Sequence, residues 1–289
     1  MELLLPRMKK YLSLVAFSHT VFALPFAVIG FVLAWYYNDV DFSIELFLKM
    51  LLCMVTARTA AMAFNRFLDA DIDAKNPRTA MREIPAGKVS RNSAIALVGV
   101  CCVVFIATCF FINQLVFLLS PVALGVVLGY SYTKRFTLLA HFVLGLGLSL
   151  APIGAYLVLV PRFDVLPVMY SFVVLCWVSG FDIIYALQDE EFDKQNNLRS
   201  VPAALGKKNA LRLSEVVHVI SAALVIAAGW WGAFGWWYWV GCSFFIAMLV
   251  YQHALVKPHD LSRVNRAFMT ANGYASVVFA VFVVADMLL

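Results

Sequence analysis

Charged side chains are scarce in this chain of 289 residues, and their scarcity excludes an ordinary water-soluble domain. Asp, Glu, Lys and Arg make up 13% of the residues, whereas soluble domains carry about a quarter. Apolar residues account for 63%, and the mean hydropathy is +0.86. The apolar residues form continuous runs of about 20 residues and not short alternating strands, so they predict membrane-spanning helices and not a barrel.

Cysteine and histidine lack any spacing that would hold a metal ion. The cysteines all lie within apolar runs, where buried thiols behave as small apolar side chains. We expect the histidines to be helix-packing or interfacial residues. The cysteines are Cys53, Cys101, Cys102, Cys109, Cys176 and Cys242, and the histidines are His19, His141, His218, His253 and His259.

Nine apolar runs are long enough to cross a bilayer. The first begins too late, and is too long, for a cleaved signal peptide, and it lacks a small-residue cleavage site, so it predicts a retained helix. The runs together predict an all-α integral membrane protein with a single domain, 1–289. They are roughly 12–37, 44–64, 93–112, 115–132, 139–160, 165–187, 210–234, 236–256 and 266–288.

Basic residues gather at the N-terminus and in every second loop, and of the 22 only Lys49, Arg58 and Arg162 lie elsewhere. Positively charged loops stay in the cytoplasm. We therefore expect a protein of the inner (cytoplasmic) membrane with a cytoplasmic N-terminus and, after nine spans, a C-terminus outside. The net charge of +5 reflects this topology and does not indicate binding to nucleic acid.

Carboxylates concentrate in two segments, 65–73 and 182–193, at the predicted cytoplasmic ends of two helices. At about 100° per residue, a spacing of four places Asn65, Asp69 and Asp73 on one helix face. The second segment has a still narrower stripe, formed by Asp182, Tyr185, Asp189 and Asp193. Stacked carboxylates repel one another unless a cation lies between them. Each stripe therefore indicates a metal site.

The two acidic segments are copies of one another. The first overlays the second at an offset of 120 residues, and 82–86 overlays 199–203 at an offset of 117. Parallel repeats of this kind place a shared site at the interface of the halves. We expect two four-helix pseudo-repeats, about 12–135 and 136–256, and a ninth helix around a central cavity, with the acidic clusters facing each other.

Oxygen ligands from a few carboxylates and an amide suit Mg²⁺, which keeps several waters and shares phosphate oxygens. Two such clusters predict two Mg²⁺ ions with a diphosphate between them. Four basic residues in the same or neighbouring loops would neutralise the remaining charge. They are Arg78, Arg82, Lys134 and Arg199. An isoprenoid diphosphate fits this arrangement, because its hydrocarbon tail belongs in membrane lipid.

Arg58 lies seven residues before Asn65, on the same face and within the predicted span. Charges inside a membrane are costly and usually functional, so Arg58 predicts a pocket residue, with snorkelling to the interface as the alternative. The remaining acids of the two segments lie off the stripes, and we expect them to be solvated. They are Asp71, Glu190 and Glu191.

These motifs resemble the paired aspartate motifs of the UbiA superfamily of membrane prenyltransferases. The resemblance includes 65–82, 182–193, the segment 130–137 with its Tyr-x3-Lys pattern, and 18–26 in the first predicted helix. It covers roughly residues 12–210. It implies nine helices around a cavity that opens sideways to lipid.

The resemblance also implies residue roles. One Mg²⁺ would be bound by Asn65 and Asp69 with Asp73 in support, and the other by Asp189 and Asp193. The diphosphate would be held by Arg78, Lys134 and Arg199, and the reacting centre would be lined by Asp182, Tyr130 and Tyr185. Many family members have Asp directly after the motif Asn, where this chain has Arg66, which leaves the first metal shell open.

The implied activity is transfer of a polyprenyl group from an isoprenoid diphosphate to an aromatic hydroxy acid in quinone biosynthesis. The short chain and the segment 149–156 are most similar to bacterial 4-hydroxybenzoate polyprenyltransferases. A related group implies 1,4-dihydroxy-6-naphthoate, for menaquinone, as the alternative acceptor. Arg58 would bind the carboxylate that both acceptors carry. Haem, chlorophyllide and glycerol phosphate remain further acceptors within the same fold.

A membrane transporter is the alternative from another functional class, since parallel repeats and charges within the membrane also occur in carriers. Transporter acids tend to lie near the bilayer midplane. The acids of this chain lie at predicted cytoplasmic ends beside basic loops, which favours an enzyme acting on a diphosphate.

Overall fold

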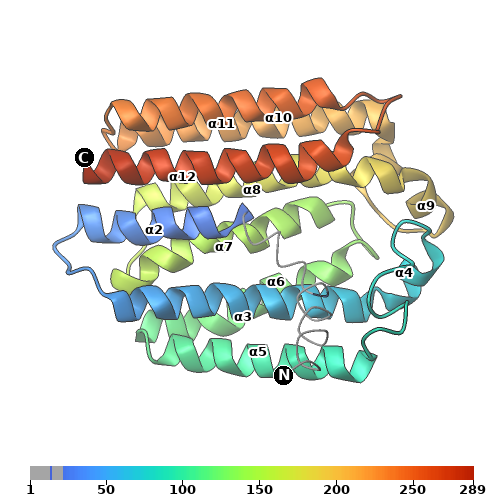
Figure 1. The fold of residues 1–289 in the computed structure, drawn as a ribbon, viewed down its shortest axis with the longest axis horizontal. Helices are drawn as coiled ribbons and strands as arrows, with labels where there is room; N and C mark the ends of the chain where they lie inside the picture. Colours follow the sequence, from blue (N-terminus) through green and yellow to red (C-terminus); the bar gives the residue numbers. More distant parts are fainter. Residues whose placement is uncertain (1–13, 15–21) are drawn as a thin grey trace, which may run out of the picture. The chain divides into compact units, whose positions relative to one another are not determined.

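The computed structural model describes residue 14 and residues 22–289 (Figure 1). The start of the first predicted helix, including residues 18–21 of the segment 18–26 that carries part of the resemblance, and with them His19, lies outside the described residues. Regular secondary structure among the described residues is helical, without a strand. The prediction of an all-α protein is therefore confirmed.

Eight helices are long and apolar enough to span a membrane, and a ninth apolar helix, α2, is shorter in the part of the chain that is described. Each of the nine predicted runs corresponds to one of these helices, so the multi-pass prediction is confirmed. The helices are α2 (Leu24–Tyr37), α3 (Ile44–Leu68), α4 (Ala70–Lys75), α5 (Arg91–Phe110), α6 (Gln114–Thr133), α7 (Ala140–Leu159), α8 (Val165–Ala186), η2 (Leu187–Asp189), α9 (Glu190–Gln195), α10 (Val201–Trp231), α11 (Trp236–Leu255), η3 (Arg266–Ala271) and α12 (Asn272–Leu288).

Helix α10 begins nine residues earlier than the predicted run 210–234, at Val201. Ser200 caps its first turn by accepting a hydrogen bond from the Ala203 N–H at 3.3 Å. The helix then breaks at Gly206, whose φ of 73° is a conformation that glycine adopts without steric cost. The predicted apolar run of this helix begins only after Gly206 and Lys207. The first turn of α10 lies before them and was therefore not predicted.

The chain forms two compact units. Among the described residues, the first contains residue 14 and 47–132, and therefore α4, α5, most of α3 and α6 up to Tyr132. The second contains 22–46 and 133–289, and therefore α2 and α7 to α12. The predicted halves, 12–135 and 136–256, stay a prediction.

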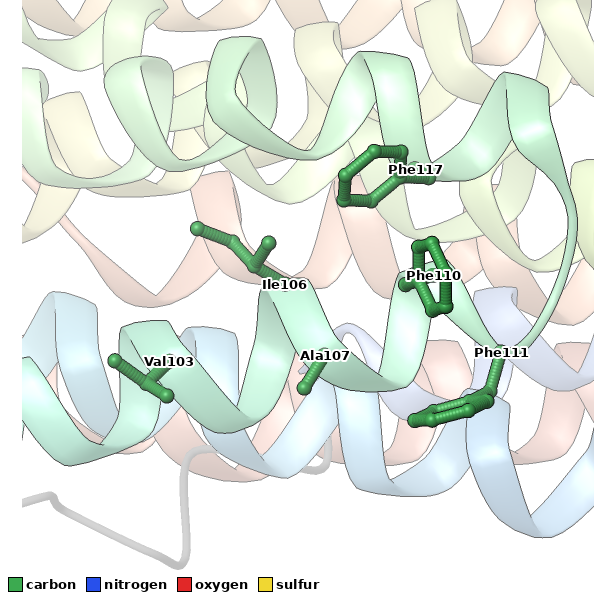
Figure 2. A pocket seen from close by; sticks show the side chains of 6 residues that line it. All are labelled: Val103, Ile106, Ala107, Phe110, Phe111 and Phe117. Carbon is green, nitrogen blue, oxygen red and sulfur yellow. The ribbon is translucent and has the colours of Figure 1, made fainter.

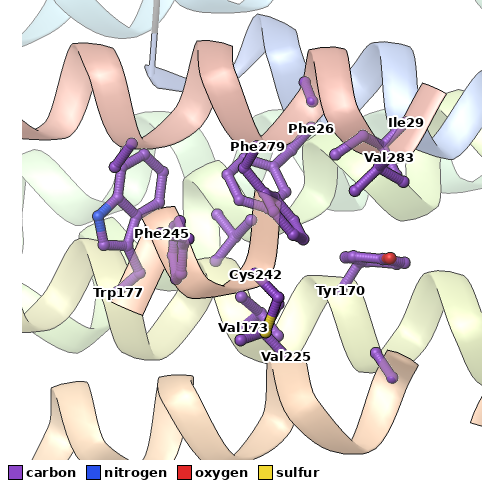
Figure 3. Packing of buried hydrophobic residues seen from close by; sticks show 14 of the residues in the cluster. Phe26, Ile29, Tyr170, Val173, Trp177, Val225, Cys242, Phe245, Phe279 and Val283 are labelled. Atoms are coloured by element: carbon purple, nitrogen blue, oxygen red, sulfur yellow. The ribbon is translucent and has the colours of Figure 1, made fainter. Parts of the chain in front are cut away.

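The core of the second unit is aromatic (Figure 3). Trp177 of α8 is fully buried and packs against Phe26 of α2 and Phe245 of α11, with ring centroids 5.4 and 5.8 Å apart. Its indole N–H donates to the Asn272 Oδ1 at 2.8 Å, so the buried polar atom is satisfied. This core holds α8, which carries the second acidic segment, in a fixed orientation within its unit.

Gly145 allows α7 to approach α8 closely. A Cβ atom at this position would lie 2.4 Å from the Ser179 Oγ and 2.6 Å from the Leu175 carbonyl oxygen, whereas a Cβ atom at Gly154 would meet nothing within 4 Å. Close approach at small residues is typical of packed membrane helices.

We expect Gly145→Ala to lower the free energy of unfolding by about 1–3 kcal/mol, because a backbone carbonyl cannot move aside cheaply. The matched variant Gly154→Ala, in the same helix, should be neutral or slightly stabilising, by at most about 1 kcal/mol. Thermal unfolding of both variants in detergent measures the difference. Equal stability of the two variants would contradict the packing described here.

Candidate functional site

A surface groove of about 400 Å³ lies on the first unit, between α5 and α6 (Figure 2). All the side chains that line it are apolar, and Phe110 and Phe111 are largely exposed. Such a groove accommodates hydrocarbon and offers nothing to a diphosphate. Its lining residues are Val103, Ile106, Ala107, Phe110, Phe111 and Phe117. The two acidic segments, and not this groove, are therefore the candidate functional residues of the two units.

The first acidic segment crosses a break between two helices. Helix α3 ends at Leu68, α4 begins at Ala70, and Asp69 between them has φ −91° and ψ 3°. The helical hydrogen bonds continue through the break, from the Asp69 N–H to the Asn65 carbonyl oxygen at 2.9 Å and from the Asp73 N–H to the Asp69 carbonyl oxygen at 2.7 Å. Accordingly the Asn65 Nδ2 donates to the Asp69 Oδ2 at 3.0 Å. The expected common face is present.

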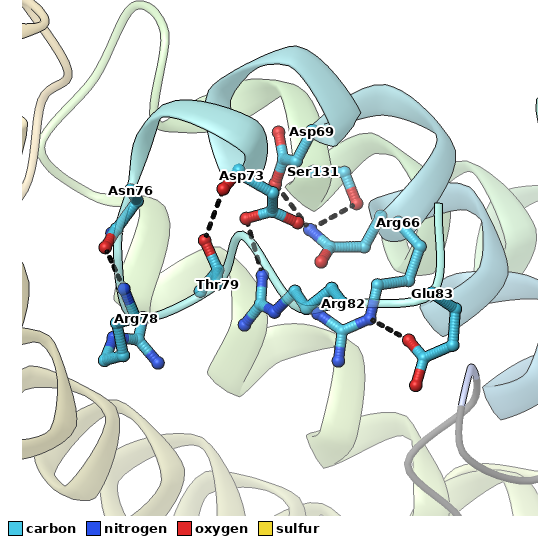
Figure 4. A network of polar contacts seen from close by, with 10 residues as sticks. Arg66, Asp69, Asp73, Asn76, Arg78, Thr79, Arg82, Glu83 and Ser131 are labelled. Atoms are coloured by element: carbon cyan, nitrogen blue, oxygen red, sulfur yellow. Dashed lines mark hydrogen bonds and ion pairs between the residues drawn. The ribbon is translucent and has the colours of Figure 1, made fainter. Parts of the chain in front are cut away.

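Two carboxylates of this segment are buried, with Asp69 1% and Asp73 4% exposed. The Arg82 Nη1 donates to the Asp73 Oδ1 at 2.7 Å, and Thr79 donates to the Asp73 carbonyl oxygen at 3.1 Å (Figure 4). The Asp73 Oδ2 is also buried but has no hydrogen-bond partner among the described residues. A buried carboxylate oxygen without a partner is costly unless a cation or donor compensates it.

Arg66 stands where many family members carry Asp, and its side chain is directed to Glu83 (Figure 4). The Arg66 Nε lies 3.8 Å from the Glu83 Oε2, and both side chains are 11% exposed. A cation at this position cannot ligate a metal ion, so Arg66 offers no ligand to the first acidic segment. Arg78 is exposed, and its backbone N–H donates to the Asn76 Oδ1 at 2.9 Å.

Arg58 of α3 and Tyr130 of α6 both lie in the first unit. The Arg58 Nε is buried without a hydrogen-bond partner among the described residues. An arginine that snorkels would place its guanidinium in water. The buried Nε therefore favours the pocket interpretation of Arg58 over snorkelling. Ser131, next to Tyr130, lies 3.5 Å from the Asn65 Nδ2.

The second acidic segment repeats the helix break of the first. Helix α8 passes through η2 into α9, and Asp189 at the start of α9 has φ −102° and ψ 3°, close to the angles of Asp69. Helices α4 and α9 are both six residues long and are followed by Asn76 and Asn196, which differ in conformation, with ψ of 118° and 14°. The break and the short helix, and not the helix end, therefore accompany the repeated sequence.

Two carboxylates of the second segment contact side chains that the sequence analysis had not assigned to the site. Asp193 accepts a hydrogen bond from the Ser200 hydroxyl at 2.7 Å. The Asp182 Oδ2 lies 2.7 Å from the Nδ1 of His141, which is 5% exposed. His141 lies 41 residues from Asp182, and α9 ends at Gln195, between Asp193 and Ser200, so no spacing along one helix could indicate either partner.

The two predicted diphosphate-binding residues of this unit, Lys134 and Arg199, come from the loops before α7 and after α9. The Arg199 Nη1 donates to the Phe136 carbonyl oxygen at 2.7 Å, and the Arg199 N–H donates to the Lys134 carbonyl oxygen at 2.8 Å. Tyr185 packs against Phe268 with ring centroids 4.2 Å apart. The structure therefore brings the predicted Lys134 and Arg199 together.

Glu190 corrects one prediction. We expected a solvated carboxylate, but Glu190 is only 9% exposed and forms ion pairs with Lys194 at 2.6 Å and Lys207 at 3.8 Å. The break at Asp189 turns α9 so that its first residue faces the start of α10 within the same unit. Asp71 is 79% exposed, as expected, and pairs with Arg91.

The donor sets fit Mg²⁺. Across the described part of the chain, no three Asp, Glu, His or Cys side chains form a group that would hold a metal ion. Each acidic segment instead offers two spaced carboxylates, and the first adds the amide of Asn65. Mg²⁺ binds proteins in this way, through one or two carboxylates with water and substrate phosphates completing its shell.

The predicted site residues fall into both compact units. The first unit contains Arg58, Asn65, Asp69, Asp73, Arg78, Arg82 and Tyr130, and the second contains Lys134, Asp182, Tyr185, Asp189, Asp193 and Arg199.

Comparison with known proteins supports the resemblance. The model of the UbiA prenyltransferase family matches residues 23–274. The 4-hydroxybenzoate octaprenyltransferase of Francisella tularensis subsp. mediasiatica (strain FSC147) is 27% identical over 80% of this chain and 81% of its own length. The enzyme of the same name from Vibrio atlanticus (strain LGP32) is 29% identical over 79% and 80%.

Solved structures agree with the fold. A UbiA homolog from Aeropyrum pernix K1, without ligand, is 33% identical, with a TM-score of 0.84 over 93% of this chain and 98% of that chain. A UbiA homolog from Archaeoglobus fulgidus bound to GPP and Mg²⁺ is 20% identical, with a TM-score of 0.77 over 97% and 100%. The second likeness bears on the fold alone.

Proposed function

The chain belongs to the UbiA prenyltransferase family, and from this premise we propose that it transfers a polyprenyl group from an isoprenoid diphosphate to the ring of 4-hydroxybenzoate. Diphosphate is the leaving group. The observation that carries the proposal is the pair of acidic segments, which share a sequence pattern and a backbone break at Asp69 and Asp189. Relatives named 4-hydroxybenzoate octaprenyltransferases support the acceptor.

Two Mg²⁺ ions would neutralise the diphosphate and help it to leave as an anion. Asn65 and Asp69, with Asp73 in support, would hold one ion. Asp189 and Asp193 would hold the other. The unpartnered Oδ2 of Asp73 supports a cation at the first segment.

The remaining contacts to the diphosphate come from basic side chains. Arg82 already lies against Asp73, so it can bridge the acidic segment and a phosphate oxygen. Fixed cations aimed at a developing negative charge are a strong form of electrostatic catalysis. The residues proposed for this role are Arg78, Arg82, Lys134 and Arg199.

The reaction breaks the allylic C–O bond of the donor and forms a C–C bond at the ring carbon beside the acceptor hydroxyl. The ring then loses the proton from that carbon. Asp182, Tyr130 and Tyr185 would line the reacting centre. The carboxylate of Asp182 would stabilise the allylic cation, and the tyrosine rings would orient the acceptor.

Arg58 is proposed to bind the acceptor carboxylate, on the evidence of its buried Nε. Arg58→Ala should raise the Michaelis constant for the acceptor about 10- to 100-fold and leave that for the donor within about 3-fold, because a charge-assisted hydrogen bond is lost only on the acceptor side. Steady-state kinetics with each substrate varied measures this. The matched control acceptor is 4-hydroxybenzyl alcohol, which lacks the carboxylate and should show no such difference. Equal changes for donor and acceptor would remove the assignment.

The same chemistry on 1,4-dihydroxy-6-naphthoate is the finer alternative, since that acceptor also carries a carboxylate. The protein is proposed to lie in the inner membrane, with the acidic segments cytoplasmic and the C-terminus outside. The basic loops support this orientation.

The test is a transfer assay on the purified protein in detergent, with geranyl diphosphate and either acceptor, and with the product identified by mass spectrometry. We expect prenylated 4-hydroxybenzoate. Product from the naphthoate alone would reassign the acceptor. Absence of product with both acceptors and of diphosphate release, from folded protein, would contradict prenyl transfer.

A further inference from the structure

His141 is a buried imidazole whose two ring nitrogens both contact polar groups. It lies in the first turn of α7 and is 5% exposed. Its Nδ1 is 2.7 Å from the Asp182 Oδ2 on α8. Its Nε2 accepts a hydrogen bond of 3.3 Å from the Val201 N–H, at the start of α10. The ring therefore joins three helices of one unit.

These two contacts determine which nitrogen carries the proton. The Val201 N–H is a donor and cannot accept, so the His141 Nε2 must present its lone pair. The proton of the neutral ring then lies on Nδ1 and is donated to Asp182. In histidine, the bond made by one ring nitrogen sets the tautomer and the orientation of the other.

The first turn of α10 also contacts the metal-binding part of the second segment. Ser200, next to Val201, donates its hydroxyl to Asp193 at 2.7 Å. The N–H of Arg199 donates to the Lys134 carbonyl oxygen at 2.8 Å. Three consecutive residues thus attach the start of α10 to a metal ligand, to the basic loop and, through His141, to Asp182.

We propose that His141 is a positioning residue: held by the Val201 N–H, it donates from Nδ1 to Asp182 and fixes this carboxylate for its role at the allylic cation. The role rests on the proposed function. Asp182 remains 22% exposed while His141 is buried behind it, so the carboxylate stays accessible to substrate and the imidazole does not. If His141 served helix packing alone, only the shape of its ring would matter. A variant that keeps the ring shape but loses the hydrogen bonds therefore distinguishes packing from positioning of Asp182.

The test compares three variants. His141→Phe keeps the ring shape. In His141→Asn the amide nitrogen can take the place of Nδ1, and in His141→Gln the amide reaches the place of Nε2. We expect His141→Phe and His141→Gln to lower kcat about 10- to 100-fold, with the Michaelis constants of both substrates within about 3-fold, as for loss of a hydrogen bond to a charged group. His141→Asn should stay within about 5-fold of the wild type.

A double-mutant cycle separates positioning from general structure. Asp182→Asn and the double variant His141→Phe with Asp182→Asn should have the same kcat, because His141 acts only through Asp182. ¹⁵N spectra of histidine-labelled wild type, assigned by difference from His141→Asn, should show the proton on Nδ1 and an unprotonated Nε2.

The outcomes separate the two proposals. A wild type that transfers no prenyl group would overturn the proposed function and, with it, this role. An active wild type would leave the function standing. In that case three results would each overturn the role of His141 alone. The first is an unchanged kcat in His141→Phe. The second is that His141→Phe lowers kcat by the same factor with and without Asp182→Asn, and the third is a proton on the His141 Nε2.

Discussion

Asp69→Ala and Asp189→Ala are each expected to lower kcat for prenyl transfer by at least about 1,000-fold. Each variant removes a carboxylate from the helix break of one acidic segment, where Asp69 and Asp189 have nearly the same backbone angles. If the two copies share one task, the two losses should be of similar size. Product formation from geranyl diphosphate and 4-hydroxybenzoate measures both.

The matched controls are acids of the same two segments that point away from the ligand stripes. Asp71 is 79% exposed, and Glu191 is exposed as well. Asp71→Ala breaks only a surface ion pair with Arg91, which contributes little. Asp71→Ala and Glu191→Ala should each keep kcat within about 2-fold of the wild-type value. A loss confined to one of Asp69 and Asp189, or a comparable loss in the controls, would contradict the paired arrangement.

Removal of divalent metal is expected to abolish turnover, with a loss of more than about 1,000-fold, and added Mg²⁺ should restore it. Ca²⁺ should restore it poorly, because it takes six to eight oxygen ligands at longer distances and each segment supplies two carboxylates. Initial rates measured against EDTA, and then against each cation at a fixed excess, give the result.

The control for this experiment establishes that the protein stays folded when the metal is removed. Thermal unfolding in EDTA should remain cooperative, since the core around Trp177 is built from apolar side chains and contains none of the proposed metal ligands. Turnover that persists in excess EDTA, or that Ca²⁺ restores as fully as Mg²⁺, would show that the acidic segments do not act as proposed.

Spacing in sequence was sufficient to predict that Asn65 and Asp69 share one helix face. Asn65 and Asp69 are four residues apart, which brings side chains together on any helix, and the structure shows them 3.0 Å apart. The nine apolar runs likewise predicted the helices, because hydrophobic length is the dominant constraint in a bilayer.

Other features depend on contacts between distant parts of the chain and were not predictable. The bond between His141 and Asp182 joins two helices across 41 residues. Glu190 was expected in water but is buried against Lys194 and Lys207, since a helix break turned it inward. The early start of α10 was hidden by Gly206, whose positive φ separates the first turn from the apolar run.

We propose that both acidic segments bind one prenyl diphosphate through Mg²⁺. Binding of geranyl thiolodiphosphate tests this, because sulfur replaces the oxygen between the prenyl carbon and phosphorus and the donor therefore does not ionise. Calorimetry with and without Mg²⁺ should show binding by the wild type that requires Mg²⁺ and is lost in both Asp69→Ala and Asp189→Ala. Binding that is independent of Mg²⁺, or that survives in either variant, would contradict the account.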